Sequence, residues 1–164
     1  MLTTRIASAA RLAAPMLAVA ALVPALASPA SAAGEPANDR FSAAQVLVGS
    51  DVFVEGDNIG ATGQLGEPVH HFAASASPES VWYAWTAPET GPVTIDLAGS
   101  DFDTVLAVYR GTSVNRLTSV TSNDDSNGTL QSSVTFTAQR RVTYRIAVDS
   151  YLNGQGNIAL SLQQ

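Results

Sequence analysis

Two acidic residues flank an aromatic one in the segment Asp101-Phe102-Asp103, just before a predicted strand. A pair of carboxyl groups about 5–9 Å apart could act as acid and base on a glycosidic bond. If the segment were extended, residues two apart would face the same side, as such a pair requires. The sequence offers no second catalytic group nearby. We therefore favour a structural role, in which Asp101 and Asp103 accept backbone N–H bonds at a turn.

A second polar run, from Asn123 to Gly128, has the composition of a calcium loop. It lacks the alternating carboxylate register and the late glutamate of an EF-hand. We therefore interpret Asn123, Asp124 and Asp125 as part of a hydrogen-bonded hairpin turn.

The chain has two histidines, His70 and His71, which are adjacent. On a strand their side chains would point to opposite faces, so the pair cannot hold one ion. Serine is abundant, but no Gly-x-Ser-x-Gly elbow marks one of them as a nucleophile. A small hydrolase using Asp101, Asp103 or His70 remains an alternative, and a protein without catalytic activity is favoured.

The overall composition narrows the function classes further. The chain has 164 residues, with 8 Lys+Arg against 14 Asp+Glu, a net charge of −6 and no cysteine. The acidic balance argues against nucleic-acid binding, which needs a basic surface. The lack of cysteine excludes a disulfide framework, a thiolate nucleophile and a cysteine-ligated metal.

The first 32 residues are typical of a secretory signal peptide. Arg5 and Arg11 precede an apolar stretch at 12–27, and Ala30-Ser31-Ala32 supplies a small-residue cleavage pattern. The apolar stretch is shorter than the ~20 residues that a membrane span needs. We predict a signal peptide at 1–32 and one domain at 33–164, secreted or periplasmic, with no membrane span after cleavage.

Beyond residue 48, apolar and polar residues alternate and helical periodicity is absent. The alternating segments are 52–54, 81–85, 93–97, 105–109, 134–136, 144–148 and 158–162. Such period-2 patterns of branched and aromatic residues are typical of half-buried strands. Turn formers separate them at intervals of about 10–13 residues, which favours a sandwich over βαβ units. We predict an all-β fold, a single antiparallel β-sandwich, with a short helical turn between Ser42 and Val48.

After residue 32 the chain carries, in this order, the segments Pro36–Phe41, Asn58–Thr62, Gly66–His70, Ser80–Pro88, Gly99–Tyr109, Asn123–Asp125 and Tyr144–Asp149. Together they resemble the bacterial pre-peptidase C-terminal (PPC) domain family. The resemblance implies a jelly-roll-like sandwich, usually a non-catalytic appendage on secreted enzymes, related in fold to the collagen-binding modules of clostridial collagenases. Residues 138–143 depart from the family's Gly-containing turn, so we expect a longer or irregular hairpin there.

The same resemblance implies a calcium site. The related collagen-binding modules hold Ca²⁺ with a Glu-Pro-x-Asn-Asn-like segment, and here Glu35, Asn38 and Asp39 match it. Glu67 or Glu79 would complete the oxygen ligands that Ca²⁺ requires. The alternative is that Asn38 and Asp39 only cap the turn before Phe41.

Trp82 and Trp85 lie three residues apart, so they face opposite sides of one strand. Trp85 shares its face with Val81 and Tyr83 and is expected in the core. Trp82 is either packed between the sheets, which we favour, or a partly exposed platform for a sugar or peptide. The sequence thus favours a secreted, non-catalytic module that binds an extracellular polymer or a partner protein, with calcium as a candidate stabilising ion. The alternative is a structural domain that aids folding or secretion.

Overall fold

The structure, a computed structural model, describes residues 34–70 and 78–164. The predicted signal peptide, residues 1–32, and His71 lie outside this range. Within the described residues, no helix is long and apolar enough to cross a membrane.

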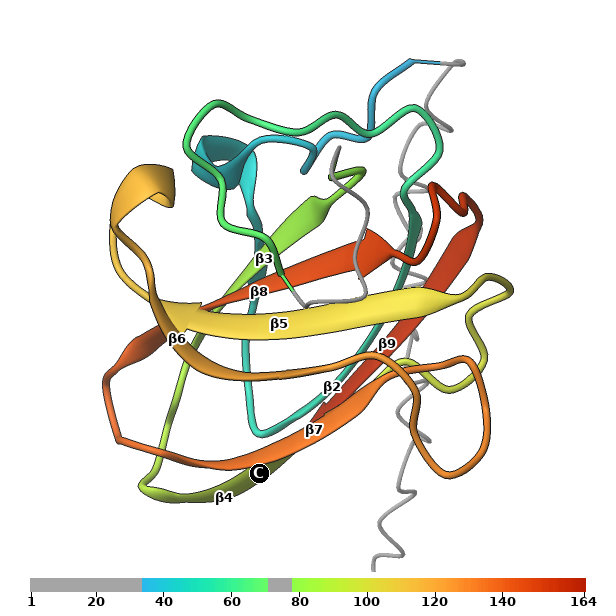
Figure 1. The fold of residues 1–164 in the computed structure, drawn as a ribbon. Helices are drawn as coiled ribbons and strands as arrows, with labels where there is room; N and C mark the ends of the chain where they lie inside the picture. The colour runs from blue at the N-terminus through green and yellow to red at the C-terminus, as the bar shows by residue number, and fades with distance from the viewer. Residues whose placement is uncertain (1–33, 71–77) are drawn as a thin grey trace, which may run out of the picture. The chain divides into compact units, whose positions relative to one another are not determined.

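The described strands form two sheets (Figure 1). The five-stranded sheet has the order β1 (Gln45–Leu47), β3 (Val81–Thr86), β8 (Thr143–Ser150), β5 (Thr104–Arg110) and β6 (Thr118–Asn123). The four-stranded sheet has the order β2 (Asp51–Asp57), β9 (Asn157–Gln163), β4 (Gly91–Asp96) and β7 (Ser133–Ala138). The predicted all-β sandwich is confirmed. It is not wholly antiparallel, because β1 pairs with β3 in parallel.

Two short 3₁₀ helices, η1 (Phe41–Ala43) and η2 (Val114–Arg116), complete the described elements. The helical turn predicted at Ser42–Val48 is therefore mostly wrong. Only the residues up to Ala43 are helical, and Gln45–Leu47 extend along β3 because that strand offers a free edge.

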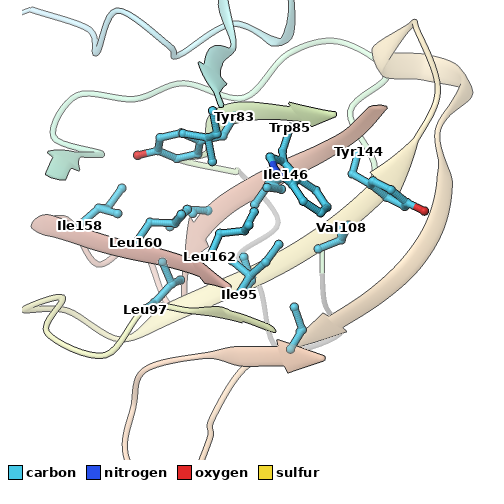
Figure 2. Close-up of a cluster of buried hydrophobic side chains, with 14 of the residues drawn as sticks. Tyr83, Trp85, Ile95, Leu97, Val108, Tyr144, Ile146, Ile158, Leu160 and Leu162 are labelled. Carbon is cyan, nitrogen blue, oxygen red and sulfur yellow. The ribbon is translucent and has the colours of Figure 1, made fainter. Parts of the chain in front are cut away.

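The main core lies between the two sheets and is built from the inward-facing positions of the alternating segments (Figure 2). Trp85, Tyr83, Ile146, Leu160 and Leu162 are all fully buried in it. Each such side chain contributes roughly 1.5–3 kcal/mol by leaving water. Trp85 also donates from Nε1 to the carbonyl oxygen of Gly49, at 2.8 Å. Its predicted place in the core is confirmed.

A second, smaller core covers the outer face of the five-stranded sheet, where Trp82 packs against Phe41 and Tyr109. The Phe41 and Trp82 ring centroids are 5.1 Å apart in an edge-to-face arrangement. Trp82 is fully buried, so both expectations for it are wrong: it is neither an exposed platform nor between the sheets. The alternation correctly placed Trp82 and Trp85 on opposite faces of the strand, but the face of Trp82 is the outer one, and the segment that carries Phe41 covers it.

The strand registers place the connections at two opposite ends of the sandwich. One end holds loops 97–103, 124–132 and 151–156 and the first residues after β2, at the right of Figure 1. We call it the acidic end. The opposite end, called here the arginine end, holds turns 48–50, 87–90, 111–117 and 139–142.

Two connections predicted as hairpins join strands of different sheets. Residues 124–132 lead from β6 in one sheet to β7 in the other, and 139–142 lead from β7 back to β8. A hairpin needs neighbouring strands in one sheet, so 139–142 is not a hairpin. Within 124–132, however, the predicted hydrogen-bonded hairpin turn is present, because Ser126 and Thr129 form an antiparallel bridge and the Thr129 N–H donates to the Ser126 carbonyl oxygen at 2.9 Å. Alternation along a strand does not tell which sheet the next strand joins.

Candidate binding site at the acidic end

Charge is segregated between the two ends of the sandwich. At the acidic end, carboxylates lie on the last residues of strands or in the loops beside them: Asp57, Asp96, Asp101, Asp103, Asp124 and Asp125. The described part of the chain places no arginine there. The arginine end carries Arg110, Arg116, Arg140 and Arg141. Since the chain contains no lysine, the acidic end has no other permanent cation to offset its charge.

Exposed apolar side chains project from the same loops. Leu152 is 72% exposed, Leu130 54%, Ile59 53% and Tyr151 38%. Single exposed apolar residues are ordinary, but several on adjoining loops mark an interaction surface. Leu152 and Asn153 also have φ angles of 51° and 62°, a backbone region that is costly for a branched side chain such as leucine.

The buried amide of Asn58 joins two of these loops. Its Oδ1 accepts from the backbone N–H of Gly156 at 2.8 Å, and its Nδ2 donates to the carbonyl oxygens of Gly154, at 3.0 Å, and Glu79, at 3.3 Å. All of its polar atoms are therefore engaged inside the protein. The loops that present Ile59 and Leu152 are held in place by this one side chain.

A shallow pocket of about 250 Å³ opens beside these loops, on the four-stranded sheet. Its lining residues are Glu55, Gly56, Gly99, Asn157, Ile158 and Ala159. The hollow exists because small residues meet there. Ala159 lies directly opposite Glu55 on the neighbouring strand, and a Cβ on Gly99 would be 3.4 Å from the Ala159 methyl.

Ser100 and Asp101 form hydrogen bonds to two residues that line the pocket. Ser100 Oγ accepts from Ala159 N–H at 3.0 Å, and Asp101 accepts from both the backbone N–H and the side-chain amide of Asn157, at 2.6 and 2.7 Å. Asp101 therefore has the structural role expected from the sequence, as an acceptor of backbone N–H. It also orients the Asn157 amide that lines the pocket.

Asp103 does not pair with Asp101, although both precede β5. Strand β5 begins only at Thr104, so the argument that residues two apart share a face does not apply. Instead, the carboxylates of Asp103, Asp124 and Asp125 lie within 4.8 Å of one another. Burial raises the pKa of Asp103, and the charges of Asp124 and Asp125 raise it further. Asn123, by contrast, has the expected structural role, because its Oδ1 accepts from Ser133 N–H at 3.0 Å.

Several solved structures are similar to this chain, among them the following two. One is the pre-peptidase C-terminal domain of a collagenase from Bacillus anthracis, with 15% identity over 73% of this chain and 94% of that chain, and a TM-score of 0.48. The other is a periplasmic inhibitor of g-type lysozyme from Aeromonas hydrophila, with 13% identity, the same coverages and a TM-score of 0.49. No protein-family model and no curated protein matches.

The first of these structures belongs to the family whose motifs the sequence resembles. At such identities neither similarity assigns a ligand or an activity to this chain.

No three of the acidic side chains that the resemblance suggested for calcium, Glu35, Asp39, Glu67 and Glu79, come together among the described residues. Among the described residues, the acidic groups that come together in threes are those of Asp103, Asp124 and Asp125 alone. Asp39 accepts from the backbone N–H and the hydroxyl of Thr62. Asn38 pairs with Trp82, donating from Nδ2 to its carbonyl oxygen at 3.2 Å and accepting from its N–H at 2.9 Å. Glu35 is exposed.

Glu67, another predicted ligand, belongs to a buried hydrogen-bond network. Its carboxylate accepts from the hydroxyl of Ser80 and the backbone N–H of Gln64, and bonds His70 Nε2 at 2.9 Å. Burial raises the pKa of Glu67, but the bonds from His70, Ser80 and Gln64 outweigh burial and leave it below its ordinary value. The last predicted ligand, Glu79, donates its backbone N–H to Asp149 Oδ1 at 2.9 Å.

The same network bears on the hydrolase alternative. His70 bonds Glu67 through Nε2 and the Tyr109 hydroxyl through Nδ1, at 3.0 Å, and its side chain is fully buried. A general base must reach the proton that it removes from a substrate. His70 is turned inward and engaged at both nitrogens, so it holds the loop before β3 rather than facing a substrate.

The residues that form this surface were not predicted from the sequence: Phe53, Glu55, Ile59, Tyr151 and Leu152. For Phe53 a signal was present. The alternation of β2 places Phe53 on the same side as the polar Asp51 and Glu55, opposite Val52 and Val54, and Phe53 is indeed 64% exposed. For the loop residues no local signal existed, since their proximity follows from the strand registers.

Proposed function

We propose that this protein is a secreted, non-catalytic β-sandwich module that binds a partner protein through its acidic end. The observation that carries the proposal is the group of exposed apolar side chains, Ile59, Leu130, Tyr151 and Leu152, set among carboxylates. Asn58 holds together the two loops that carry Ile59, Tyr151 and Leu152. Protein interfaces have an apolar centre within a polar rim, and they gain affinity when their loops are already ordered.

A partner protein fits this surface better than a flat polymer. Leu152 and Ile59 project from turns rather than lying in a sheet face, so they suit a partner with pockets of its own. The secreted location rests on the predicted signal peptide. The non-catalytic role is supported by the inward engagement of His70 and by the bonding of Asp101 to Asn157.

Immobilised protein, purified after expression of the full chain, is incubated with extracellular proteins of the source organism, and separately with collagen, chitin, cellulose and peptidoglycan. The unaltered protein should capture one protein partner in a fixed ratio, and the Leu152→Ser variant should lose it. Val48→Ser is the matched control, because Val48 is 82% exposed but lies at the arginine end.

Equal capture by Leu152→Ser and the unaltered protein would overturn the site. Capture of a polysaccharide or of collagen, unaffected by Leu152→Ser, would overturn the choice of partner. Circular dichroism melts of each variant establish that the substitutions leave the fold intact.

A further inference from the structure

The pocket over Ala159 has one carboxylate, and that carboxylate is not neutralised within the protein. Glu55 lies on β2 at the rim of the pocket and forms no ion pair with any described residue. The charged neighbours along the same side of the strand, Asp51 and Asp57, have the same sign. Asp101, behind the pocket, is also acidic and already holds Asn157. The surroundings therefore favour a cation.

An exposed aromatic ring lies next to the pocket. Phe53 precedes Glu55 by two residues on the same face of β2, which places it roughly 7 Å along the strand. It is 64% exposed and opposite the small Ser161. A guanidinium group stacks on an aromatic face and at the same time forms two parallel hydrogen bonds to a carboxylate. Phe53 and Glu55 offer both of these contacts from adjacent outward positions.

The size of the pocket suits one side chain. At about 250 Å³ it is smaller than the ~300–1,000 Å³ of pockets that enclose a whole small-molecule ligand. The pocket is open because Ala159 and Gly99 are small, and larger side chains at these two positions would fill it. The pocket also adjoins Asp57, which leads into the loop that carries Ile59, so one partner can cover both features.

We propose that the partner is a basic protein and that one of its arginines enters the pocket over Ala159, ion-paired to Glu55 and stacked on Phe53. This inference rests on the proposed function and adds the chemistry of the partner to it. The negative field of the acidic end attracts such a partner from a distance, and the pocket fixes its register.

The probe is a fluorescein-labelled peptide of about 12 residues in which arginines alternate with glycine and serine. In the control peptide each arginine is replaced by citrulline, which has the same shape but no charge. Fluorescence anisotropy measures binding to the full chain at about 20 mM and about 300 mM NaCl. The arginine peptide should bind more tightly than the citrulline peptide, and the difference should shrink at high salt.

Three variants locate the contact. Glu55→Gln should weaken arginine-peptide binding about fivefold, as expected for loss of a partly exposed ion pair with good geometry. Phe53→Ser should weaken it by a similar factor. Glu89→Gln is the matched control, with the same chemical change at an exposed carboxylate of the arginine end, and should bind as the unaltered protein does.

Equal weakening by Glu55→Gln and Glu89→Gln would show that only net charge matters and would overturn the pocket. Equal binding of the citrulline and arginine peptides would overturn the cationic partner. Either failure can be told apart from failure of the proposed function. If Leu152→Ser no longer captures the partner but Glu55→Gln still does, the acidic end is still the binding surface.

Discussion

Asp39 accepts two hydrogen bonds from Thr62, one from its backbone N–H and one, at 3.0 Å, from its hydroxyl. Asp39 lies just before η1, and Thr62 lies in the loop that follows β2. The pair therefore ties two segments together above the second core, where Trp82 is buried. Asp39, which the sequence suggested as a calcium ligand, thus holds two segments of the chain together.

We expect the Asp39→Ala variant to lose about 2 kcal/mol of unfolding free energy, because it removes both hydrogen bonds that the buried carboxylate of Asp39 accepts from Thr62. The loss should be equal in EDTA and in millimolar CaCl₂, measured by urea denaturation. Asp39→Asn keeps one acceptor oxygen and should lose less. A loss that appears only in CaCl₂ would contradict this role and favour the calcium site.

The Glu67 network predicts a pH dependence with a definite sign. The pKa of Glu67 is lower in the folded protein than its ordinary value of 4.5. Its ionised form therefore contributes stability above pH 4.5, and that contribution is lost as pH falls through the folded pKa. Glu67→Gln should be less stable at pH 7 by about 2 kcal/mol and should lose less than the unaltered protein on acidification.

Thermal melts between about pH 3 and pH 7 test this prediction. Glu35→Gln is the control, because Glu35 is exposed at the surface. A Glu67→Gln variant whose stability falls in acid as steeply as that of the unaltered protein would contradict the assignment.

Local sequence pattern was enough to predict most strands and the sandwich. Alternation identified seven of the nine described strands, since each of the seven has apolar residues facing the core. It missed β1 and β6. Strand β1 is only Gln45–Leu47, and β6 has a single apolar residue, Val120, in an otherwise Thr/Ser/Asn sequence. Both are edge strands, whose pairing depends on the neighbour rather than on their own residues.

Apart from the exposure of Phe53, local sequence pattern could not predict the contacts that build the site and its surroundings. Trp82 was assigned to the correct side of its strand, but what covers that side comes from residues more than 40 positions earlier. Likewise Asp103 meets Asp124 only because β5 and β6 pair antiparallel, with Leu106 opposite Asn123. Such contacts are fixed by register, which spacing along the chain does not reveal.

The turn between β7 and β8 contains a residue in an unfavourable backbone conformation. Arg141 has φ = 66°, in the left-handed region, and its N–H donates to Ala87 at 2.8 Å. A left-handed backbone conformation destabilises the folded state by about 1–2 kcal/mol for an L-residue. Glycine removes that strain, but its greater freedom in the unfolded chain opposes folding by about half as much. Arg141→Gly should therefore stabilise the protein by about 0.5–1 kcal/mol.

Urea denaturation of Arg141→Gly and of its neighbour Arg140→Gly tests this. Arg140 has no positive φ and donates from Nε to the Pro88 carbonyl oxygen, so its replacement by glycine should destabilise. Destabilisation by both substitutions would contradict the interpretation of this turn.

The last prediction concerns the crowded carboxylates of Asp103, Asp124 and Asp125. The folded pKa of Asp103 lies above its ordinary value of 3.8, because burial and the two neighbouring charges disfavour ionisation. The ionised form is thus a cost to the folded state, absent below pH 3.8 and growing as pH rises through the folded pKa. Asp103→Asn should raise the melting temperature at pH 7 in EDTA, and this gain should vanish near pH 3.8.

Asp51→Asn removes the same charge from an exposed position outside the cluster and should give no comparable gain. The same melts in about 1 mM CaCl₂ test the calcium expectation, since extracellular calcium sites work at ~10⁻⁴–10⁻³ M. If CaCl₂ raises the melting temperature of the unaltered protein and Asp103→Asn abolishes that rise, an ion binds at this cluster. If Asp39→Ala abolishes the rise instead, the ion binds at the segment suggested by the resemblance. If Asp103→Asn melts below the unaltered protein in EDTA at pH 7, repulsion is not the dominant interaction among these three carboxylates.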